Sequence, residues 1–283
     1  MNFKHNYLRF FSLIYTIMSN FDEDKKIYLT SSVFFYNDKM YYEDDTCEEN
    51  IKYTKLTTRN WPKYLDEYGW ENINEGWVKR LGNKKYCRYG IIDCGANGDC
   101  LFHCISEALT KPYDPNEKLY DFQDIRDIAA NQINDDNFTI ILENYKLLKS
   151  TNDFDGYWEP ENVENIGELK DVIKEPGDSF WGDHIMIQLL QEALDTNIIL
   201  MNSDKEFLWS EETDLPLEER FNIHPMAHNI NKHPRTILLY YIDGLHFMLV
   251  GYFNGKCMKT IFDTDKLPKN FLKVYEKDCK LSF

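Results

Sequence analysis

The sequence predicts a mixed α/β fold in which a mostly antiparallel sheet is flanked by helices. Two observations lead to this prediction. Between residues 236 and 262, three runs rich in β-branched and aromatic residues are separated by Asp243-Gly244 and Asn254-Gly255, dipeptides that strongly favour tight hairpins. Between residues 100 and 194, apolar residues recur at helical spacing. We therefore expect an antiparallel meander in the last third of the chain and helices before it.

The first third of the chain predicts a hairpin and an aromatic cluster. Residues 27–42 contain two β-forming runs, 27–30 and 32–36, before the polar turn Asn37-Asp38-Lys39, and we expect a hairpin there. Trp61, Trp70 and Trp77 follow among charged residues. Their large apolar area favours core packing over ligand binding.

The middle of the chain predicts four helices and one strand. The helices are expected directly behind Cys100, over residues 119–129, over residues 141–148 and after Asp183, and a strand is expected at residues 198–201. Residues 150–179 are polar and contain glycine and proline. We expect a long irregular connection there, of the kind that often binds a partner.

Composition limits the classes of partner. The 283-residue chain has 48 acidic and 32 basic residues, a formal net charge of −16, which argues against nucleic-acid binding and favours a basic partner segment. Seven cysteines are an odd number in a long chain, so reduced thiols in a cytoplasmic compartment are the simpler interpretation. We expect no cofactor.

The amino terminus allows two interpretations. An apolar run at residues 10–18 follows Lys4 and Arg9, which is typical of a signal or anchor segment, although the run is too short to span a bilayer. Alternatively, residues 1–17 lie upstream of the true start at Met18. We favour the second interpretation and expect no membrane association. Richness in Asn, Lys, Ile and Tyr hints at a viral source, in which case the compartment is the host cytoplasm.

Cys100 is the candidate nucleophile. Two glycines, Asn97 and Asp99 precede it, and helical spacing follows it, so a loop brings the thiol to a helix amino terminus. Backbone N–H groups there favour a thiolate and a developing oxyanion. The structural alternative is a cysteine that simply packs at the start of a buried helix.

A metal site at these thiols is not favoured. Cys87, Cys94, Cys100 and Cys104 include no CxxC pair, and His103 is only a helix neighbour. A redox or zinc-binding cysteine cluster is the last-ranked function. His184, at the start of a predicted helix, is expected to be a surface or structural residue.

His246 is the candidate general base. If Asp243-Gly244 forms a two-residue turn, Tyr241 lies opposite His246, whose side chain shares a strand face with Met248 and Val250. A strand beside a tight turn holds an imidazole rigidly. A cysteine at a helix start and a histidine on a strand form the pair that thiol hydrolysis requires.

Four segments, in order, resemble the ovarian-tumour (OTU) family of cysteine proteases. Asn97-Gly98-Asp99-Cys100-Leu101-Phe102 is similar to the family's Asp-Gly-Asn-Cys-Leu-Phe box. The other segments are Phe180–Asp183, the strand 198–201, and Ile237–Tyr241 followed by Gly244–Phe247. The resemblance implies a papain-like α/β domain that cleaves ubiquitin, or a ubiquitin-like modifier, from its conjugates after the C-terminal glycine, with Cys100 as nucleophile and His246 as base.

The resemblance also sets the expected boundaries. Residues 84–262 form the OTU-like domain, residues 1–83 an N-terminal extension and residues 263–283 a C-terminal tail. The acidic stretch from Asp153 to Glu168 is expected to bind the arginines of the ubiquitin tail.

The third catalytic residue is the open question, because the chain departs from the family pattern. Asn97 stands where the family has aspartate, and Met248 stands where it often has aspartate or asparagine. Asn97 is our first choice for orienting the imidazole, and Asp93 and Asp66 are the alternatives. Gly98 and Asp99 are expected to shape the oxyanion loop, with Asp99 also a candidate helix cap. These departures motivate a second hypothesis, a catalytically silent OTU-like module that binds ubiquitin or another protein.

Overall fold

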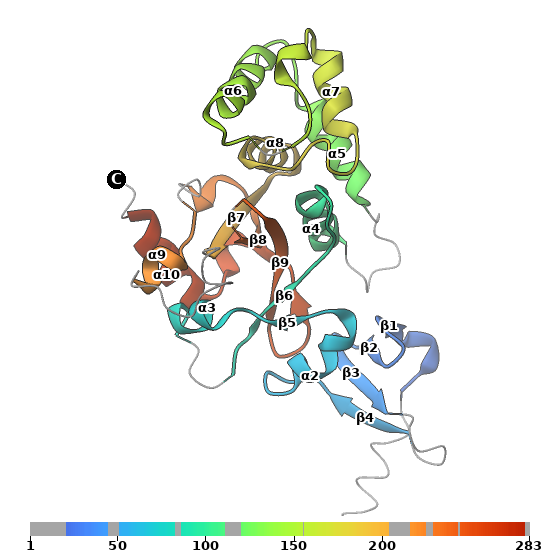
Figure 1. Cartoon of the computed structure of the whole chain (residues 1–283). Coiled ribbons are helices and arrows are strands. Elements are labelled where there is room, and N and C mark those ends of the chain that lie inside the picture. Colours follow the sequence, from blue (N-terminus) through green and yellow to red (C-terminus); the bar gives the residue numbers. More distant parts are fainter. Residues whose placement is uncertain are drawn as a thin grey trace, which may run out of the picture. The chain divides into compact units, whose positions relative to one another are not determined.

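The chain forms two compact units in the computed structural model (Figure 1). Unit 1 is Met1–Glu71 with Phe253–Met258, and unit 2 is Asn72–Tyr252 with Lys259–Phe283. The structure describes residues 21–44, 51–82, 86–110, 120–154, 156–203, 216–224, 229–242 and 244–280. The predicted features at residues 1–18, at Leu119 and at Asp243 lie outside these residues.

Unit 1 contains an antiparallel sheet of order β1-β2-β3-β4. Asn37 and Asp38 have φ of 46° and 59°, the left-handed conformation of a tight hairpin turn between β2 and β3, so the predicted hairpin is confirmed. Lys26 is buried beside this sheet, where its amine pairs with Glu43 at 2.9 Å. The elements of this unit are η1 (Glu23–Lys25), β1 (Ile27–Tyr28), β2 (Val33–Tyr36), β3 (Lys39–Asp44), β4 (Lys52–Lys55), α2 (Trp61–Leu65) and η2 (Asp66–Tyr68).

The sheet of unit 2 is mostly antiparallel, which confirms the predicted fold class. Its order is β11-β8-β9-β6-β5; β7 pairs with β8 in parallel and β10 pairs with β9. The strands are β5 (Glu71–Asn72), β6 (Tyr89–Ile92), β7 (Thr196–Ser203), β8 (Arg235–Ile242), β9 (His246–Phe253), β10 (Met258–Lys259) and β11 (Ile261–Asp263).

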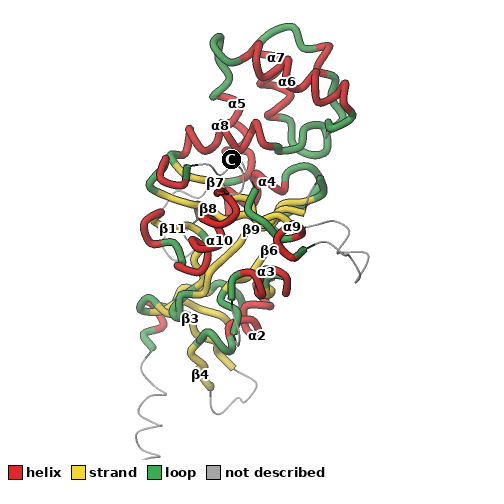
Figure 2. The backbone as a smooth tube through the Cα atoms, turned by 90° about the vertical axis from the view of Figure 1, so that its left-hand side faces the viewer, coloured by secondary structure: helices red, strands yellow, loops and turns green. Residues whose placement is uncertain are grey.

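Helices surround this sheet. In Figures 1 and 2, α5, α6, α7 and α8 gather together beyond one end of the strands. In Figure 1, α4 and α10 lie to either side of the strands. The helices are α3 (Glu75–Arg80), α4 (Cys100–Leu109), α5 (Phe122–Asn131), α6 (Phe138–Thr151), η3 (Pro160–Asn162), α7 (Ile166–Lys174), α8 (His184–Leu194), α9 (Leu217–Arg220), η5 (Ile230–Lys232), η6 (Thr264–Lys266) and α10 (Lys269–Lys280).

The tryptophans are buried, as predicted. Trp61 is 0%, Trp70 4% and Trp77 0% exposed, so all three pack in the interior. The indole N–H of Trp77 donates to the Asn202 carbonyl at 3.0 Å, which satisfies its polar atom. These side chains therefore stabilise the fold.

The compact units divide the chain differently from the expected boundaries. Trp77 on α3 packs in one cluster with Phe271 and Tyr275 on α10, against strand residues such as Val250. Residues 263–283 therefore contain a core helix of unit 2. The sequence interpretation missed this because those residues lie beyond the family resemblance, although Phe271, Val274 and Tyr275 have helical spacing.

Two local predictions were wrong. The stretch 150–179, predicted as an irregular connection, contains α7. The buried residues of this helix are Leu169 and Ile173, and two apolar positions among polar residues are too few to show helical periodicity. The third strand of the meander is broken into β10, which pairs with β9, and β11, which pairs with β8.

The hairpin register before His246 also differs from the prediction. Ile242 lies opposite His246 and Tyr241 opposite Phe247, so the loop has three residues rather than two. The Leu245 N–H donates to the Ile242 carbonyl at 2.9 Å, and the Gly244 N–H donates to the Tyr241 hydroxyl at 2.9 Å. A loop with Gly244 at φ 57° closes the hairpin one residue later.

Candidate active site

Cys100 is the first residue of α4 and is 7% exposed. The loop before it bends sharply, because Asn97 and Gly98 have φ of 60° and 83°. The first hydrogen bond of the helix runs from the His103 N–H to the Asp99 carbonyl at 2.9 Å. The N–H of Cys100 therefore lies among the first amides of the helix, which have no partner within it.

His246 forms a hydrogen bond with Asp93. Its Nε2 lies 3.1 Å from Asp93 Oδ1. Asp93 directly follows β6, which pairs antiparallel with β9, so the end of β6 lies beside the start of β9. The Gly95 N–H donates to the same carboxylate oxygen at 3.0 Å. Strand pairing and a local turn thus place the carboxylate against the imidazole.

The other two candidates for orienting the imidazole make no hydrogen bond with it in the described part of the chain. Asn97 is exposed at the tip of its loop. Among the described residues, the side chain that hydrogen-bonds the His246 ring is Asp93 and not Asn97. Asp66 belongs to η2 of unit 1, where it lines a small pocket with Tyr64 and Glu67.

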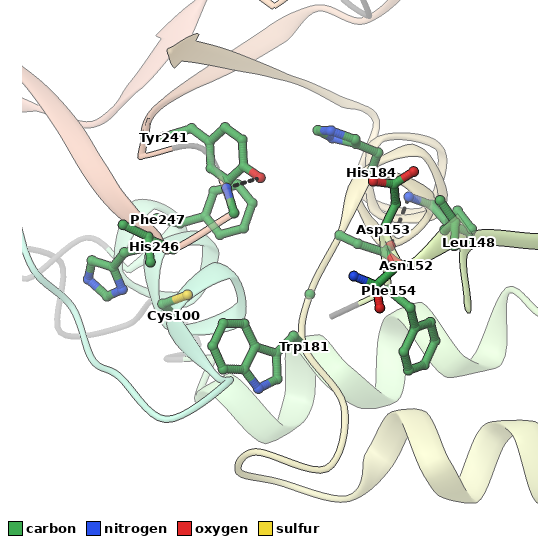
Figure 3. A pocket seen from close by; sticks show the side chains of 15 residues that line it. Cys100, Leu148, Asn152, Asp153, Phe154, Trp181, His184, Tyr241, His246 and Phe247 are labelled. Atoms are coloured by element: carbon green, nitrogen blue, oxygen red, sulfur yellow. Dashed lines mark hydrogen bonds between the residues drawn. The ribbon is translucent and has the colours of Figure 1, made fainter. Parts of the chain in front are cut away.

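Cys100 and His246 line one pocket of about 530 Å³ (Figure 3). In this view the Cys100 sulfur lies between the rings of His246 and Trp181. Tyr241 stacks on Phe247 with ring centroids 4.6 Å apart and forms another wall. The remaining lining comes from the end of α6, from the start of α8 and from the hairpin loop before β9.

Burial dominates the electrostatics of the nucleophile. It raises the pKa of the Cys100 thiol, whereas the backbone amides of Phe247, Leu101 and Cys100 lower it, and the charge of Asp93 raises it. The neutral thiol is thus the favoured resting form in this geometry. A base is needed to remove its proton.

Asp99 occupies the N-cap position of α4 but does not cap it with its side chain. Its carboxylate instead accepts from Arg126 Nε at 2.7 Å and from the Gly177 N–H at 2.9 Å. Arg126, on α5, is 0% exposed. Sequence reasoning missed Arg126, although an arginine among the apolar positions of a predicted helix signals a buried ionic partner.

The segment before α8 packs onto the nucleophile loop. A Cβ at Gly98 would lie 2.3 Å from the Gly177 carbonyl oxygen, and a Cβ at Gly182 would lie 2.6 Å from Leu101. Asp183 caps α8 by accepting from the N–H groups of Ile185 and Met186 at 2.9 and 3.0 Å. This cap orients the pocket wall that contains Trp181.

His184 lines the pocket, and the surface or structural role that the sequence suggests for it stays a prediction. Its ring lies 4.5 Å from that of His224, and the side chain is half-buried. The sequence feature that points to this position is that His184 directly follows Phe180–Asp183, one of the segments that resemble the OTU family.

Among its described residues, the acidic stretch contributes the carboxylate of Asp153 to the pocket. Asp153 lines it and is exposed. Glu159 pairs instead with Lys149 at 2.5 Å, and Glu161 with Lys146 at 3.9 Å. Fewer of the described carboxylates of this stretch therefore line the pocket than we expected for a surface that binds a basic tail.

Cys104 lies close to the site but outside the pocket lining. Cys104 is fully buried and its sulfur donates to the Phe247 carbonyl at 3.5 Å. Within the described ranges, no group of three or more His, Cys, Asp or Glu side chains is arranged to bind a metal ion. In the same part of the chain, no helix is both long and apolar enough to cross a membrane.

Comparisons with known proteins show similarity to one family. A family model described as OTU-like cysteine protease matches residues 95–247. A search of curated proteins gives no match. Similar solved structures include an ovarian-tumour (OTU) domain in complex with ubiquitin, 14% identical with a TM-score of 0.37, where the match covers 69% of this chain and 84% of that one.

Two further solved structures are similar. The OTU domain of OTUD1 is 15% identical with a TM-score of 0.36, and the match covers 62% of this chain and 92% of that one. An OTU deubiquitinase from Wolbachia pipientis wMel is 12% identical with a TM-score of 0.33, with coverage of 66% and 95%.

Proposed function

The chain belongs to the family of OTU-like cysteine proteases, and we propose that it is a thiol hydrolase that cleaves isopeptide bonds after the C-terminal glycine of ubiquitin or a ubiquitin-like modifier. The observation that supports this function is the placement of Cys100 at the amino end of α4, in one pocket with the Asp93-bound His246. Two groups of this kind are sufficient for acyl transfer by a thiol.

The chemistry has two steps. Asp93 holds Nε2 of His246, which leaves Nδ1 to take the proton of the Cys100 thiol. The sulfur attacks the isopeptide carbonyl, and the backbone N–H of Cys100 stabilises the oxyanion. His246 returns the proton to the leaving lysine amine, and a thioester remains. Water, activated by the same imidazole, then releases the carboxylate of the modifier and the free thiol.

Features of the pocket support a narrow, basic substrate tail. The aromatic walls at Trp181 and Tyr241 leave room for an extended chain with small residues, and the Asp153 carboxylate is placed to bind a cation. The described cysteines are free thiols, which supports a reducing compartment such as the cytoplasm.

A ubiquitin probe with a C-terminal electrophile tests this function. The wild-type protein should become covalently linked to the probe at Cys100, and a Cys100→Ala variant should not. Binding of ubiquitin without labelling would instead identify a silent binding module. The silent module was proposed because the family's acidic residues are replaced at positions 97 and 248, whereas Asp93 lies within hydrogen-bond distance of the His246 imidazole.

A further inference from the structure

We infer that Arg126 is a positioning residue that fixes the nucleophile loop against the Trp181 wall of the pocket. This inference rests on the proposed function and adds a residue to its machinery. Arg126 does not line the pocket, and its hydrogen bonds go to the Asp99 carboxylate and to two backbone carbonyls. Its charge also acts on Cys100, so the test below replaces it by lysine, which keeps the positive charge and removes the planar hydrogen-bonding group.

The guanidinium binds three segments that are far apart in the sequence. Arg126 Nε donates to Asp99, directly before the nucleophile. Its two terminal nitrogens donate to the Ile173 carbonyl at 2.7 Å and to the Phe180 carbonyl at 2.9 Å. Phe180 directly precedes Trp181. One rigid, planar group thus links the loop before Cys100, the end of α7 and the pocket wall.

The ion pair has a second connection to the same wall. The other carboxylate oxygen of Asp99 accepts from the Gly177 N–H at 2.9 Å. The segments 95–99 and 177–183, which we call the two clamped loops, are therefore joined through both the carboxylate and the guanidinium. Gly98 lies so close to the Gly177 carbonyl that the clamped loops leave no room for a Cβ there.

Burial makes this arrangement stiff. Arg126 is 0% and Asp99 7% exposed, and the guanidinium lies 4.3 Å from the centre of the Phe102 ring. A buried ion pair with all its hydrogen bonds in place has one favoured geometry, because any displacement leaves a charge without its partner. The backbone N–H of Cys100 and the Trp181 ring consequently keep a fixed separation.

The expected catalytic signature follows from when the oxyanion forms. A misplaced oxyanion donor affects only the transition state, so kcat falls while KM changes little. Alkylation of Cys100 by iodoacetamide forms no oxyanion, so it depends on the loop amides only through their effect on the pKa of the thiol. Arg126 should therefore affect hydrolysis much more than alkylation.

The chain offers a matched control in a second buried ion pair. Arg80 binds Asp278 at 2.5 Å, with side chains 3% and 6% exposed, and Asp278 also accepts from the Ile223 N–H at 2.9 Å. Arg80 further donates to the Phe221 carbonyl at 2.6 Å. This pair has the same chemistry in the same unit, but none of its residues lines the pocket.

The experiment compares Arg126→Lys with Arg80→Lys in the full chain. With a ubiquitin C-terminal aminocoumarin amide as substrate, Arg126→Lys should lower kcat about 100-fold, the size expected for a displacement near 1 Å, and change KM less than about two-fold. Alkylation of Cys100 should stay within about two-fold of wild type. Arg80→Lys should lower thermal stability but keep kcat.

Hydrogen exchange provides a readout that does not depend on activity. Exchange in the two clamped loops should accelerate in Arg126→Lys and not in Arg80→Lys. If Arg126→Lys does not fold, Asp99→Asn, which keeps the side-chain shape, should show the same exchange pattern. Equal exchange in the Arg126 and Arg80 variants, or a parallel loss of alkylation and turnover, would overturn the inference. A wild-type chain without turnover, but with the expected exchange pattern, would refute the proposed function and support the clamp.

Discussion

Our proposal that Asp93 orients His246 rests on a single hydrogen bond. Asp93 Oδ1 lies 3.1 Å from Nε2, and the Gly95 N–H holds the same oxygen from the other side. A carboxylate would stabilise the imidazolium formed in the proposed attack better than an amide would. Asp93 therefore fits this role better than Asn97.

Replacing Asp93 by alanine should lower kcat about 10²–10⁴-fold, because the imidazole loses its orientation and charge partner. Asn97→Gly is the matched control, since glycine tolerates the φ of 60° found at this position. Turnover of the ubiquitin aminocoumarin amide measures both. A loss in Asn97→Gly equal to that in Asp93→Ala would return the role to Asn97.

At the scale of elements, the site depends on how closely two loops approach. Gly98 has a φ of +83°, and a Cβ added at this position would lie 2.3 Å from the Gly177 carbonyl oxygen. A backbone oxygen cannot rotate out of the way as a side chain can. The glycine is thus required both by its own conformation and by the wall that packs on it.

Gly98→Ala should consequently destabilise the protein more than Gly82→Ala, which has a φ of +68° but no atom within 4 Å of its Cβ. The strain of a positive φ costs about 1–2 kcal/mol in either variant, and the clash adds about 1–3 kcal/mol to Gly98→Ala alone. Thermal unfolding of the two variants measures the difference. Equal melting temperatures would mean that the two loops are not held together.

At the scale of the whole molecule, several ionisable groups are buried in the neutral state. Burial raises the pKa of Tyr89, of Tyr145 and of Cys104, and it raises the pKa of Tyr275 to about 12. Tyr89 also donates to Asn270 at 2.9 Å through its hydroxyl. These groups keep their protons in the folded state at pH values where the unfolded chain has lost them.

The stability of the protein should therefore fall as pH rises above about 9, where unfolded cysteines and then tyrosines begin to ionise. Each group contributes a slope of up to about 1.4 kcal/mol per pH unit, from its unfolded pKa up to its folded pKa. Urea unfolding between pH 7 and 10.5 measures this loss. Tyr89→Phe removes one of the groups and should flatten the decline, whereas an equally steep decline would exclude Tyr89 as a contributor.

The sequence by itself determined the features that depend on neighbouring residues, namely the secondary structure, the fold class and the family resemblance. Helical spacing behind Cys100 and the glycine-bearing turns of the last third predicted the fold class, and the β-forming runs before Asn37-Asp38 predicted a hairpin. The segments at residues 97–102 and 180–183 indicated the family. Each of these signals lies within a few residues, because periodicity and turn chemistry are properties of neighbours.

Only the tertiary structure decided which distant groups meet. The pairing of β6 with β9 brings Asp93 to His246, and the three-residue loop before β9 sets a register that the dipeptide rule missed. The partners of Arg126 are 27 to 54 residues away in the sequence, so only the packed structure shows which groups it binds. The place of α10 in the core is likewise seen only in the structure, because its partners lie on α3 and the sheet. Contacts of this kind depend on how the strands and helices come together in space, and no local pattern carries that information.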